Sequence, residues 1–391
     1  MSANNGRVAK IREHFPTLVD WTYLNTAFAA PPPAEVIEAD RAFLEQRVQA
    51  PDALGSWIAV VDETRASVAR LIGAQPSEIG FTTAAAEGEN IVANGLDWRA
   101  GDNVVIDDLA YPTAPVLWQQ RQQTHRIEVR LVRNVDGRVN FDDIERAVDK
   151  RTRLISVSHV SYLNGFCYDL RALADLAHAH GAVLYADATQ SVGAIRLNVR
   201  DEQVDFLTCG VYKWLLGPVG LSFFYVKEEW QDRLPPSEFG WWQLQSYAYS
   251  EDDTRRVDAA RSPLWQTARR YEPGSLNFQA IFGLRPALQF VESLDPAWIE
   301  ARVLALNIYL REQLEALGLA LFTPADNRSG VCTFFTDDES GLAEYLRERR
   351  IAVTGRAGSR QVRVSPHFYN TMEEVDLLCA AIAAWQSQKR R

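Results

Sequence analysis

The sequence predicts an α/β protein with a large domain on a mostly parallel sheet and a smaller α+β domain at its C-terminal end. Between residues 103 and 210, apolar segments of strand length alternate with segments of helical period. Strands separated by helices in this way pair in parallel, and the helices cover both faces of the sheet. From about residue 275 onward, long helical stretches surround a few short strands instead.

The length of the chain supports this division, because 391 residues are more than one compact core requires. We expect the large domain to span 16–275 and the small domain to span 276–391. Residues 1–15 are expected to pack against the small domain.

The elements of the large domain follow from the pattern in order. Apolar runs predict strands at 103–108, 127–132, 153–161, 182–188 and 205–210, and helical period predicts helices at 116–125, 141–150 and 169–181. Gly181 ends the last of these helices, as glycine commonly does. Ligands of parallel sheets bind at the carboxyl ends of the strands, so functional residues are expected there.

The small domain is expected to combine helices at 281–294, 297–318, 339–350 and 372–388 with a strand at 351–356, while the segments 330–336 and 362–370 lie between these elements. Residues 235–270, just before it, show no clear period. An irregular segment of this length is typically functional. It contains five prominent aromatic residues, Trp241, Trp242, Tyr247, Tyr249 and Trp265. We expect these rings at the entrance of the site or in a subunit interface.

Composition narrows the classes of function. Basic residues number 41 and acidic residues 51, and the net charge of −10 argues against binding of nucleic acid or anionic lipid. No apolar run approaches the roughly 20 residues of a membrane helix, and no apolar signal-peptide centre follows Met1. The cysteines are scattered without metal-site spacing, at Cys167, Cys209, Cys332 and Cys379. We expect a cytoplasmic protein with reduced thiols, no metal centre, and no nucleic-acid or membrane partner.

Lys213 lies in surroundings that indicate chemistry. It stands between Tyr212 and Trp214, before the apolar stretch LLGPVG, and such surroundings can make an amine nucleophilic. Alone, this lysine could simply extend to solvent, and Asp187 could simply cap a turn. Asp187, however, ends a buried strand 26 residues earlier. A strand-end aspartate and a loop lysine at this spacing indicate a pyridoxal phosphate site, where they bind the ring nitrogen and the aldehyde.

With these residues in place, the chain resembles the class V aminotransferase family of fold-type I pyridoxal phosphate enzymes. This family includes cysteine desulfurases, selenocysteine lyases, kynureninases and isopenicillin-epimerase-like proteins. The resemblance runs from YLNTAFAAPPP (23–33) to RVSPHFYNTMEEVD (363–376). Its most specific segments are ADATQSVGA (186–194), YKWLLGP (212–218) and YEPGSLNF (271–278).

The resemblance implies pyridoxal 5'-phosphate as cofactor and a role for each matching residue. Lys213 would form the Schiff base, Asp187 would pair with the pyridinium nitrogen, and Gln190 would lie beside the phenolic oxygen. Backbone N–H groups at Ala85 and Ala86, where relatives carry hydroxyl residues, would meet the phosphate at a helix start. The remaining implied cofactor contacts are Thr83 and Tyr212 at the phosphate, Tyr111 over the ring, and either Tyr162 or Asn164 at the phenolic oxygen.

The resemblance also implies a homodimer with shared active sites. Ser275 in YEPGSLNF would reach the phosphate of the partner's cofactor. Arg363 matches the arginine that pairs with the substrate α-carboxylate, for which a guanidinium is well suited. Asn25 is a further substrate contact implied by the match, and Arg356 and Arg360 are possible helpers.

The resemblance does not extend to a persulfide-forming cysteine. Cysteine desulfurases carry it shortly before the carboxylate-binding arginine, whereas residues 354–364 read TGRAGSRQVRV. Cys332 and Cys379 lie in apolar stretches typical of inert buried thiols, and Cys167 could approach the pocket without being equipped as a nucleophile. We therefore expect an aminotransferase or lyase acting at the α-carbon of an amino acid, with Lys213 as the base for the α-proton.

Other functions remain as alternatives. The first is an amino-acid epimerase, which would use Tyr111 as a second acid or base. A silent scaffold protein on this fold would be expected to lack Lys213 or Asp187, and both are present. An NAD enzyme would carry G-x-G-x-x-G after an early strand, and the sequence has no such motif there.

Overall fold

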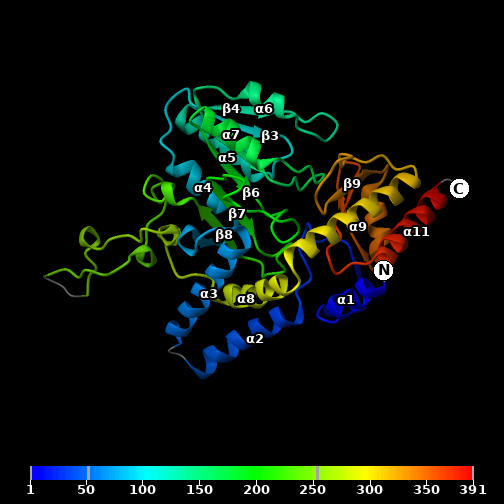
Figure 1. Ribbon diagram of the computed structural model, residues 1–391, viewed down its shortest axis with the longest axis horizontal. Helices are drawn as coiled ribbons and strands as arrows, with labels where there is room; N and C mark the ends of the chain where they lie inside the picture. Colours follow the sequence, from blue (N-terminus) through cyan, green and yellow to red (C-terminus); the bar gives the residue numbers. More distant parts are fainter. Residues whose placement is uncertain (1, 51–52, 252–254, 390–391) are drawn as a thin grey trace.

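A seven-stranded sheet forms the centre of the computed structural model, which describes residues 2–50, 53–251 and 255–389 (Figure 1). Its strand order is β2-β8-β7-β6-β5-β3-β4. The strands are β2 (Ile79–Thr82), β3 (Asn103–Asp107), β4 (Glu128–Val132), β5 (Thr152–Ser158), β6 (Val183–Asp187), β7 (Phe206–Gly210) and β8 (Ser222–Val226). The five strands predicted between residues 103 and 210 are all present, and the prediction of a mostly parallel sheet is confirmed.

Strands β2 and β8 were not predicted, and β8 runs antiparallel to both of its neighbours. The reason lies in residues 211–221, which join β7 to β8 without a helix. A parallel partner would need a crossover of a dozen or more residues, whereas a shorter connection favours the antiparallel direction. This connection contains Lys213, so both strands hold the loop that carries it.

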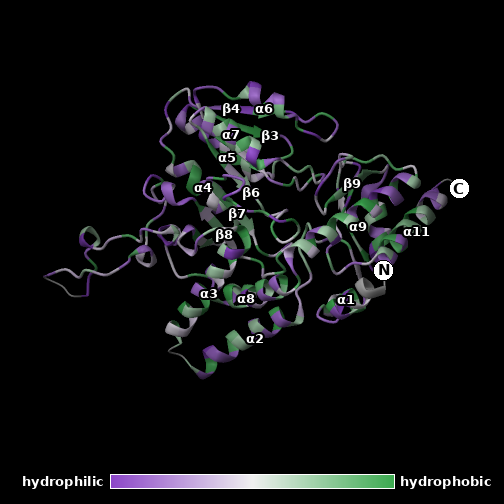
Figure 2. Ribbon diagram, in the orientation of Figure 1, coloured by the Kyte–Doolittle hydropathy of each residue, from purple (hydrophilic) through white to green (hydrophobic). Residues whose placement is uncertain are grey.

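Helices cover both faces of the sheet and bury two apolar cores. On one face, α4 (Ala85–Gly95) and α5 (Thr113–His125) pack on residues such as Val104, Leu154 and Phe224. On the other face, the core includes α3 (Leu54–Ile72), α7 (Leu170–Ala179) and α8 (Phe278–Ser293). The structure also contains α2 (Ala34–Gln49), packed on α8, and α6 (Phe141–Ala147) beside β4. Hydrophobic and hydrophilic residues alternate along these helices, as one buried face requires (Figure 2).

The C-terminal region combines three helices with two small sheets. Strands β11 (Thr354–Arg356), β12 (Gln361–Val364) and β9 (Cys332–Phe335) form an antiparallel sheet, and β10 (Ile351–Ala352) pairs in parallel with β1 (Thr22–Tyr23). The strand predicted over 351–356 is therefore divided between two sheets. The helices are α9 (Pro296–Ala316), α10 (Glu339–Glu348) and α11 (Met372–Lys389).

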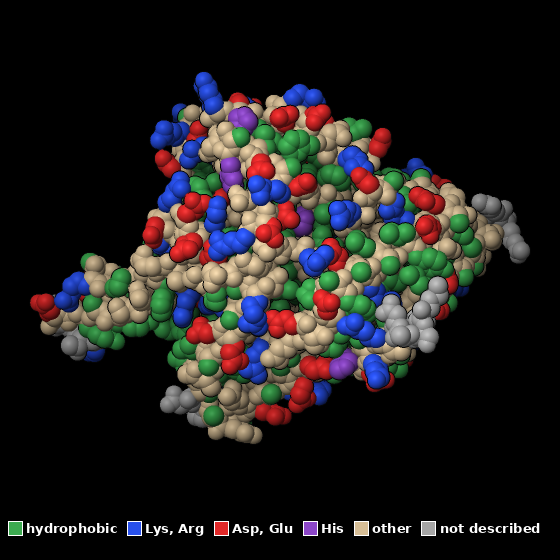
Figure 3. All heavy atoms as spheres, viewed as in Figure 1, with side chains coloured by type: hydrophobic (Ala, Val, Ile, Leu, Met, Phe, Trp, Pro, Cys, Tyr) green, Lys and Arg blue, Asp and Glu red, His purple; other side chains and the backbone are tan. Residues whose placement is uncertain are grey.

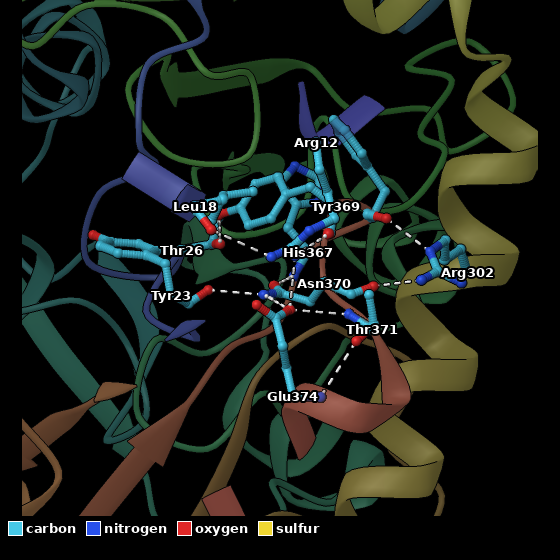
Figure 4. Close-up of polar contacts among 11 residues, drawn as sticks. Arg12, Leu18, Tyr23, Thr26, Arg302, His367, Tyr369, Asn370, Thr371 and Glu374 are labelled. Atoms are coloured by element: carbon cyan, nitrogen blue, oxygen red, sulfur yellow. Dashed lines mark hydrogen bonds and ion pairs between the residues drawn. The ribbon is translucent and has the colours of Figure 1, made fainter. Parts of the chain in front are cut away.

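The N-terminal segment lies against the C-terminal region. Arg12, the last residue of α1 (Ser2–Arg12), donates to the carbonyl of Tyr369 at 2.9 Å and to the carboxylate of Glu374 at 3.0 Å (Figure 4). Arg302 of α9 reaches the same turn by donating to the carbonyl of Phe368 at 2.7 Å. The domain division at residue 275 stays a prediction; because α8 packs on α2 and α3, we propose that the large domain extends through α8.

Residues 235–270 form an irregular arm that projects from the body of the molecule (Figures 1 and 3). Bridges between Leu244 and Leu264 and between Tyr249 and Val257 fold the arm back on itself. Phe239 and Tyr249 are 72% and 52% exposed. Residues 252–254 of the predicted irregular segment lie outside the described residues. Among the helices that the structure describes, none is long and apolar enough to span a membrane.

Candidate active site

A cavity of about 760 Å³ opens at the carboxyl edge of the central sheet. Strands β2, β3, β5, β6 and β7 all end toward it, so that the loops following them form its walls. Eight of the predicted site residues line it: Ala85, Ala86, Tyr111, Asp187, Gln190, Tyr212, Lys213 and Arg363. They come from segments far apart in the sequence, so the fold brings the predicted constellation together.

Lys213 places its amine inside this cavity. The residue is 6% exposed, and its Nζ lies 5.4 Å from the ring centre of Tyr212 and 5.7 Å from that of Tyr111. Burial lowers the pKa of the amine to about 8, although the charge of Asp187 acts in the opposite direction. About a tenth of this amine is therefore uncharged and nucleophilic at pH 7, far more than for an ordinary lysine.

The residue after Lys213 anchors the loop. The fully buried Trp214 donates from Nε1 to Oε1 of Gln190 at 2.8 Å, and its carbonyl accepts from Nε2 of His367 at 3.0 Å. Burial lowers the pKa of His367 to about 3, so its imidazole stays neutral. His367 belongs to the turn that also holds Arg12 and Glu374 (Figure 4), which links the lysine loop to the C-terminal region.

Asp187 ends β6 and points its carboxylate toward the cavity. One oxygen accepts from the backbone N–H of Thr189 at 2.9 Å, and the carbonyl of Asp187 accepts from the N–H of His159 at 2.9 Å. These contacts fix the carboxylate and leave its other oxygen available to a donor in the cavity. Gln190 donates to the carbonyl of Ala27 at 2.9 Å and retains a second N–H.

The N-terminus of α4 faces the same cavity. Ala84 precedes the helix, and no side chain caps the N–H groups that follow at Ala85 and Ala86. Uncapped N–H groups at a helix start bind anions such as phosphate. Thr83 also lines the cavity, but its backbone N–H and its hydroxyl both donate to Glu87. A lysine amine, a carboxylate and an uncapped helix start form a donor set that fits pyridoxal phosphate.

A guanidinium with no acidic partner among the described residues lines the same cavity. Arg363 is 5% exposed, donates to the carbonyl of Tyr162 at 2.8 Å, and leaves its buried Nε without a partner. Burial, with Arg356 adding to it, lowers its pKa to about 10. Arg356 also lines the cavity and lies 5.2 Å from the ring centre of Tyr162. Arg360, expected as a helper, instead pairs with Asp337 outside the cavity.

The choice between Tyr162 and Asn164 follows from their contacts. Tyr162 lines the cavity, and its ring contacts that of Tyr111 at 5.0 Å between centroids. The amide nitrogen of Asn164 donates to the carbonyls of Gly137 and Phe322, and its oxygen accepts from Phe166. Asn164 therefore holds loops together, and the structure leaves Tyr162 as the cavity residue of this pair.

Several predicted residues lie outside the cavity of their own chain. Asn25 contacts it only through Thr354, whose hydroxyl donates to Asn25 at 2.6 Å. Ser275 is exposed, and none of the five aromatic residues singled out in 235–270 lines the cavity of the same chain, so their place at an entrance or in a subunit interface stays a prediction. No cysteine lines the cavity. Burial raises the pKa of all four thiols, which are Cys167, Cys209, Cys332 and Cys379.

The structure adds cavity residues that the sequence did not indicate. Glu89 of α4 is 3% exposed and lines the floor, while Phe28, at 64%, lies at the rim. The sequence could have drawn attention to Glu89, because an acidic residue at a buried helix position is unusual. Its neighbours come from other elements, however, and only the fold identifies them.

Known proteins are similar to this chain over most of its length. The aminotransferase class-V family model matches residues 22–378. The uncharacterized aminotransferase YcbU of Bacillus subtilis is 28% identical, with 84% of this chain and 85% of that protein covered. A cysteine desulfurase of Escherichia coli strain 536 is 30% identical, with 96% and 97% covered. The apo structure of a cysteine desulfurase from Thermococcus onnurineus is 25% identical, covers 96% of this chain and 97% of its own, and gives a TM-score of 0.86. The predicted resemblance and fold class are confirmed.

Proposed function

Because the chain belongs to the class V aminotransferase family, we propose that it acts as an aminotransferase or lyase at the α-carbon of an amino acid. The prediction of a pyridoxal-phosphate-dependent enzyme is confirmed at the level of the family. The observation that carries the finer proposal is the buried amine of Lys213 beside Asp187 and within one cavity with Arg363.

When bound, pyridoxal phosphate supplies an aldehyde that condenses with amines and a ring that stabilises negative charge at the α-carbon. Lys213 would hold the aldehyde, and its amine is placed to accept the α-proton of a substrate. Asp187 would accept a hydrogen bond from the protonated ring nitrogen. The N–H groups at Ala85 and Ala86, with the hydroxyl of Tyr212, would hold the phosphate.

Arg363 defines the class of substrate. A buried guanidinium with a free Nε calls for an anion, and a planar carboxylate offers two acceptors to it. An α-amino acid bound there directs its amine toward Lys213 on the other side of the cavity. Tyr111 and Tyr162 lie between these two walls and limit movement of the bound substrate.

We propose a reaction without a protein persulfide. Arg356 pairs with Gln361 across β11 and β12, so a four-residue turn, 357–360, occupies the place of a cysteine-bearing loop. The four thiols are absent from the cavity lining, and burial makes them poor nucleophiles. Transfer of an amino group and elimination of a β-substituent require no thiol.

We further propose that the enzyme is a cytoplasmic homodimer in which Ser275 contacts the phosphate bound by the partner subunit. Phe28 and Val219, at the cavity rim, are 64% and 73% exposed. Exposed apolar side chains beside a site are typical of a surface that another chain covers. Ser275 is exposed and therefore free to extend to that chain. The cysteines are unpaired, in agreement with a reducing compartment.

The test is product analysis of the cofactor-loaded protein with a panel of amino acids. Pyridoxamine phosphate together with a keto acid indicates transamination, and pyruvate with a released fragment indicates β-elimination. Change of configuration without either product would replace this proposal by the epimerase alternative. Lys213→Ala is the control and should abolish every product; equal turnover in that variant would contradict the proposed role of Lys213.

A further inference from the structure

Glu89 is a buried acidic residue on the floor of the cavity, and the proposed function assigns no role to it. Its Oε1 accepts two hydrogen bonds, from Nε1 of Trp118 at 2.9 Å and from the hydroxyl of Ser156 at 2.8 Å. Both hydrogen bonds go to Oε1, and the charges that act on the side chain include no cation of the described residues. A carboxyl group without a cation in such a place is expected to be neutral unless a cation arrives.

The position of Glu89 relative to Asp187 follows from strand register. Ser156 pairs with Tyr185, and Ser158 pairs with Asp187, on the neighbouring strands β5 and β6. Residues two apart on a strand point to the same face, so Ser156, Tyr185 and Asp187 share the face that α4 covers. Glu89 contacts Ser156 and therefore lies one step deeper than Asp187 on that face.

The groups around Glu89 leave Asp187 as its main electrostatic neighbour. From α5 it faces the indole of Trp118, and from β5 the hydroxyl of Ser156, neither of which titrates in the usual range. From β6 it faces Tyr185 and Asp187. Burial raises the pKa of Tyr185 well above its usual value, so this phenol is uncharged. Burial first, and the charge of Asp187 as a smaller cause, raises the pKa of Glu89 to about 7.

We propose that Glu89 is a positioning residue for the cofactor ring, partly protonated in the empty site at neutral pH and fully ionised once a cationic ring nitrogen lies against Asp187. The proton leaves Glu89 for solvent, and the ring nitrogen keeps its own proton. A cation bound at Asp187 would then be acted on by two carboxylates rather than one, which would favour the protonated form of the nitrogen. This inference rests on the proposed function, because it requires pyridoxal phosphate to occupy the cavity.

The experiment measures protons released when pyridoxal phosphate binds to the apoenzyme at pH 7, with a pH-indicator dye in weakly buffered solution. Glu89→Gln keeps the acceptor for Trp118 and Ser156 but cannot ionise. Because a carboxyl with a pKa of about 7 is half protonated at this pH, the native protein should release about half a proton more per site than Glu89→Gln. Contributions from the phosphate and from Lys213 occur in both proteins and cancel in the difference.

Two further measurements test the inference without relying on the Glu89→Gln variant alone. Glu145→Gln, at an exposed position of α6, should release as many protons as the native protein. In the native protein alone, infrared difference spectra should show loss of the C=O band of a protonated carboxylic acid on binding. Equal proton release in native protein and Glu89→Gln, or binding without loss of that band, would overturn the inference. Absence of cofactor binding by the native protein would instead overturn the proposed function, and this inference with it.

Discussion

The amine of Lys213 loses its proton more easily than an ordinary lysine because the folded chain removes its water. Its pKa of about 8 lies below the usual lysine value, so ammonium dominates below pH 8 and free amine above it. Only the free amine attacks a carbonyl. The rate of reductive methylation of Lys213 in the apoenzyme should therefore rise with pH and level off above about pH 8, as followed by mass spectrometry.

The exposed Lys150 provides the internal comparison for the reagent itself in this experiment. Dividing the rate at Lys213 by the rate at Lys150 removes the pH dependence of the reagent. A rate at Lys213 that still increased steeply up to about pH 10 would show that burial does not shift its titration.

The guanidinium of Arg363 permits a second prediction at the residue scale. Lysine in its place keeps the charge but loses the paired geometry that a carboxylate prefers. Loss of a hydrogen bond to a charged group costs about 1.5–3 kcal/mol, so Arg363→Lys should raise KM by roughly 10- to 100-fold in steady-state kinetics. Arg360→Lys, three residues earlier and paired with Asp337 outside the cavity, should leave KM unchanged. Equal KM values for the two variants would remove Arg363 from substrate binding.

For single residues, the sequence predicted those whose chemistry follows from a local sequence motif. Lys213, Asp187 and Arg363 stand in recognisable segments, and all three line one cavity. Glu89 was missed because its meaning depends on Trp118 and Ser156, which lie on other elements. The expectation that Arg360 helps at the cavity was wrong. Its proximity to Arg363 in sequence does not reveal that its backbone is left-handed, with φ 58°, at a turn leading away from the cavity.

The elements were predictable where period and composition agree, and less so where tertiary context decides. The alternating strands and helices between residues 103 and 210 were found. Strand β2 is only four residues long, and nothing local to β8 indicates that it runs antiparallel. The length of the connection 211–221 determines that direction, together with the pairing of β8 with β2 and β7. The segment 351–356 reads as one strand but divides because β10 pairs with β1 from the N-terminal part of the chain.

One element is held by a buried ion pair. The segment that begins YEPGS is fixed to β2 by Glu272, whose fully buried carboxylate accepts from Arg65 at 2.8 and 3.2 Å and from the N–H of Phe81 at 2.8 Å. Arg65→Met leaves this carboxylate buried without a cation. Such a loss costs about 3–5 kcal/mol in the free energy of unfolding, measurable by chemical denaturation.

The double variant Arg65→Met with Glu272→Met tests the reason for that loss. Because it removes both charges, it should recover much of the stability lost in Arg65→Met. Arg171→Met breaks the exposed pair with Asp175 and should change the free energy of unfolding by less than about 1 kcal/mol. A double variant as unstable as Arg65→Met would show that packing, rather than the unpaired charge, dominates.

For the whole molecule, the sequence predicted the order of the two regions but not the shape of their connection. The aromatic residues of 235–270 were expected at the entrance of the site or in a subunit interface, and the arm that carries them extends away from the body (Figure 1). A sequence without period does not specify direction, and among the described residues of the arm Trp242 and Ala268 join the cores while Phe239 and Tyr249 stay exposed. Figure 3 shows both signs of charge spread over the visible face, with apolar side chains along the arm. Exposed rings such as Trp241, Tyr247 and Tyr249 are typical of a surface that another chain covers, in agreement with the proposed homodimer.

The shared-site homodimer leads to a test at the scale of the assembly. In Lys213→Ala homodimers neither site can bind the aldehyde, and in Ser275→Ala homodimers both sites lose one hydrogen bond to the phosphate. That loss is about 1.5–3 kcal/mol, or roughly 10- to 100-fold in cofactor affinity. If Ser275 serves the partner, a hybrid of the two variants has one site with both lesions and one with neither. An excess of Lys213→Ala chains mixed with Ser275→Ala chains should therefore restore native cofactor affinity to the Ser275→Ala chains, measured as the absorbance of lysine-bound cofactor.

The reference is Ser275→Ala mixed with itself, which should show no change. Because cofactor bound across the interface stabilises association, sedimentation should also show tighter dimers in its presence. Verified hybrids without recovered affinity, or a monomer with full activity, would contradict the shared site.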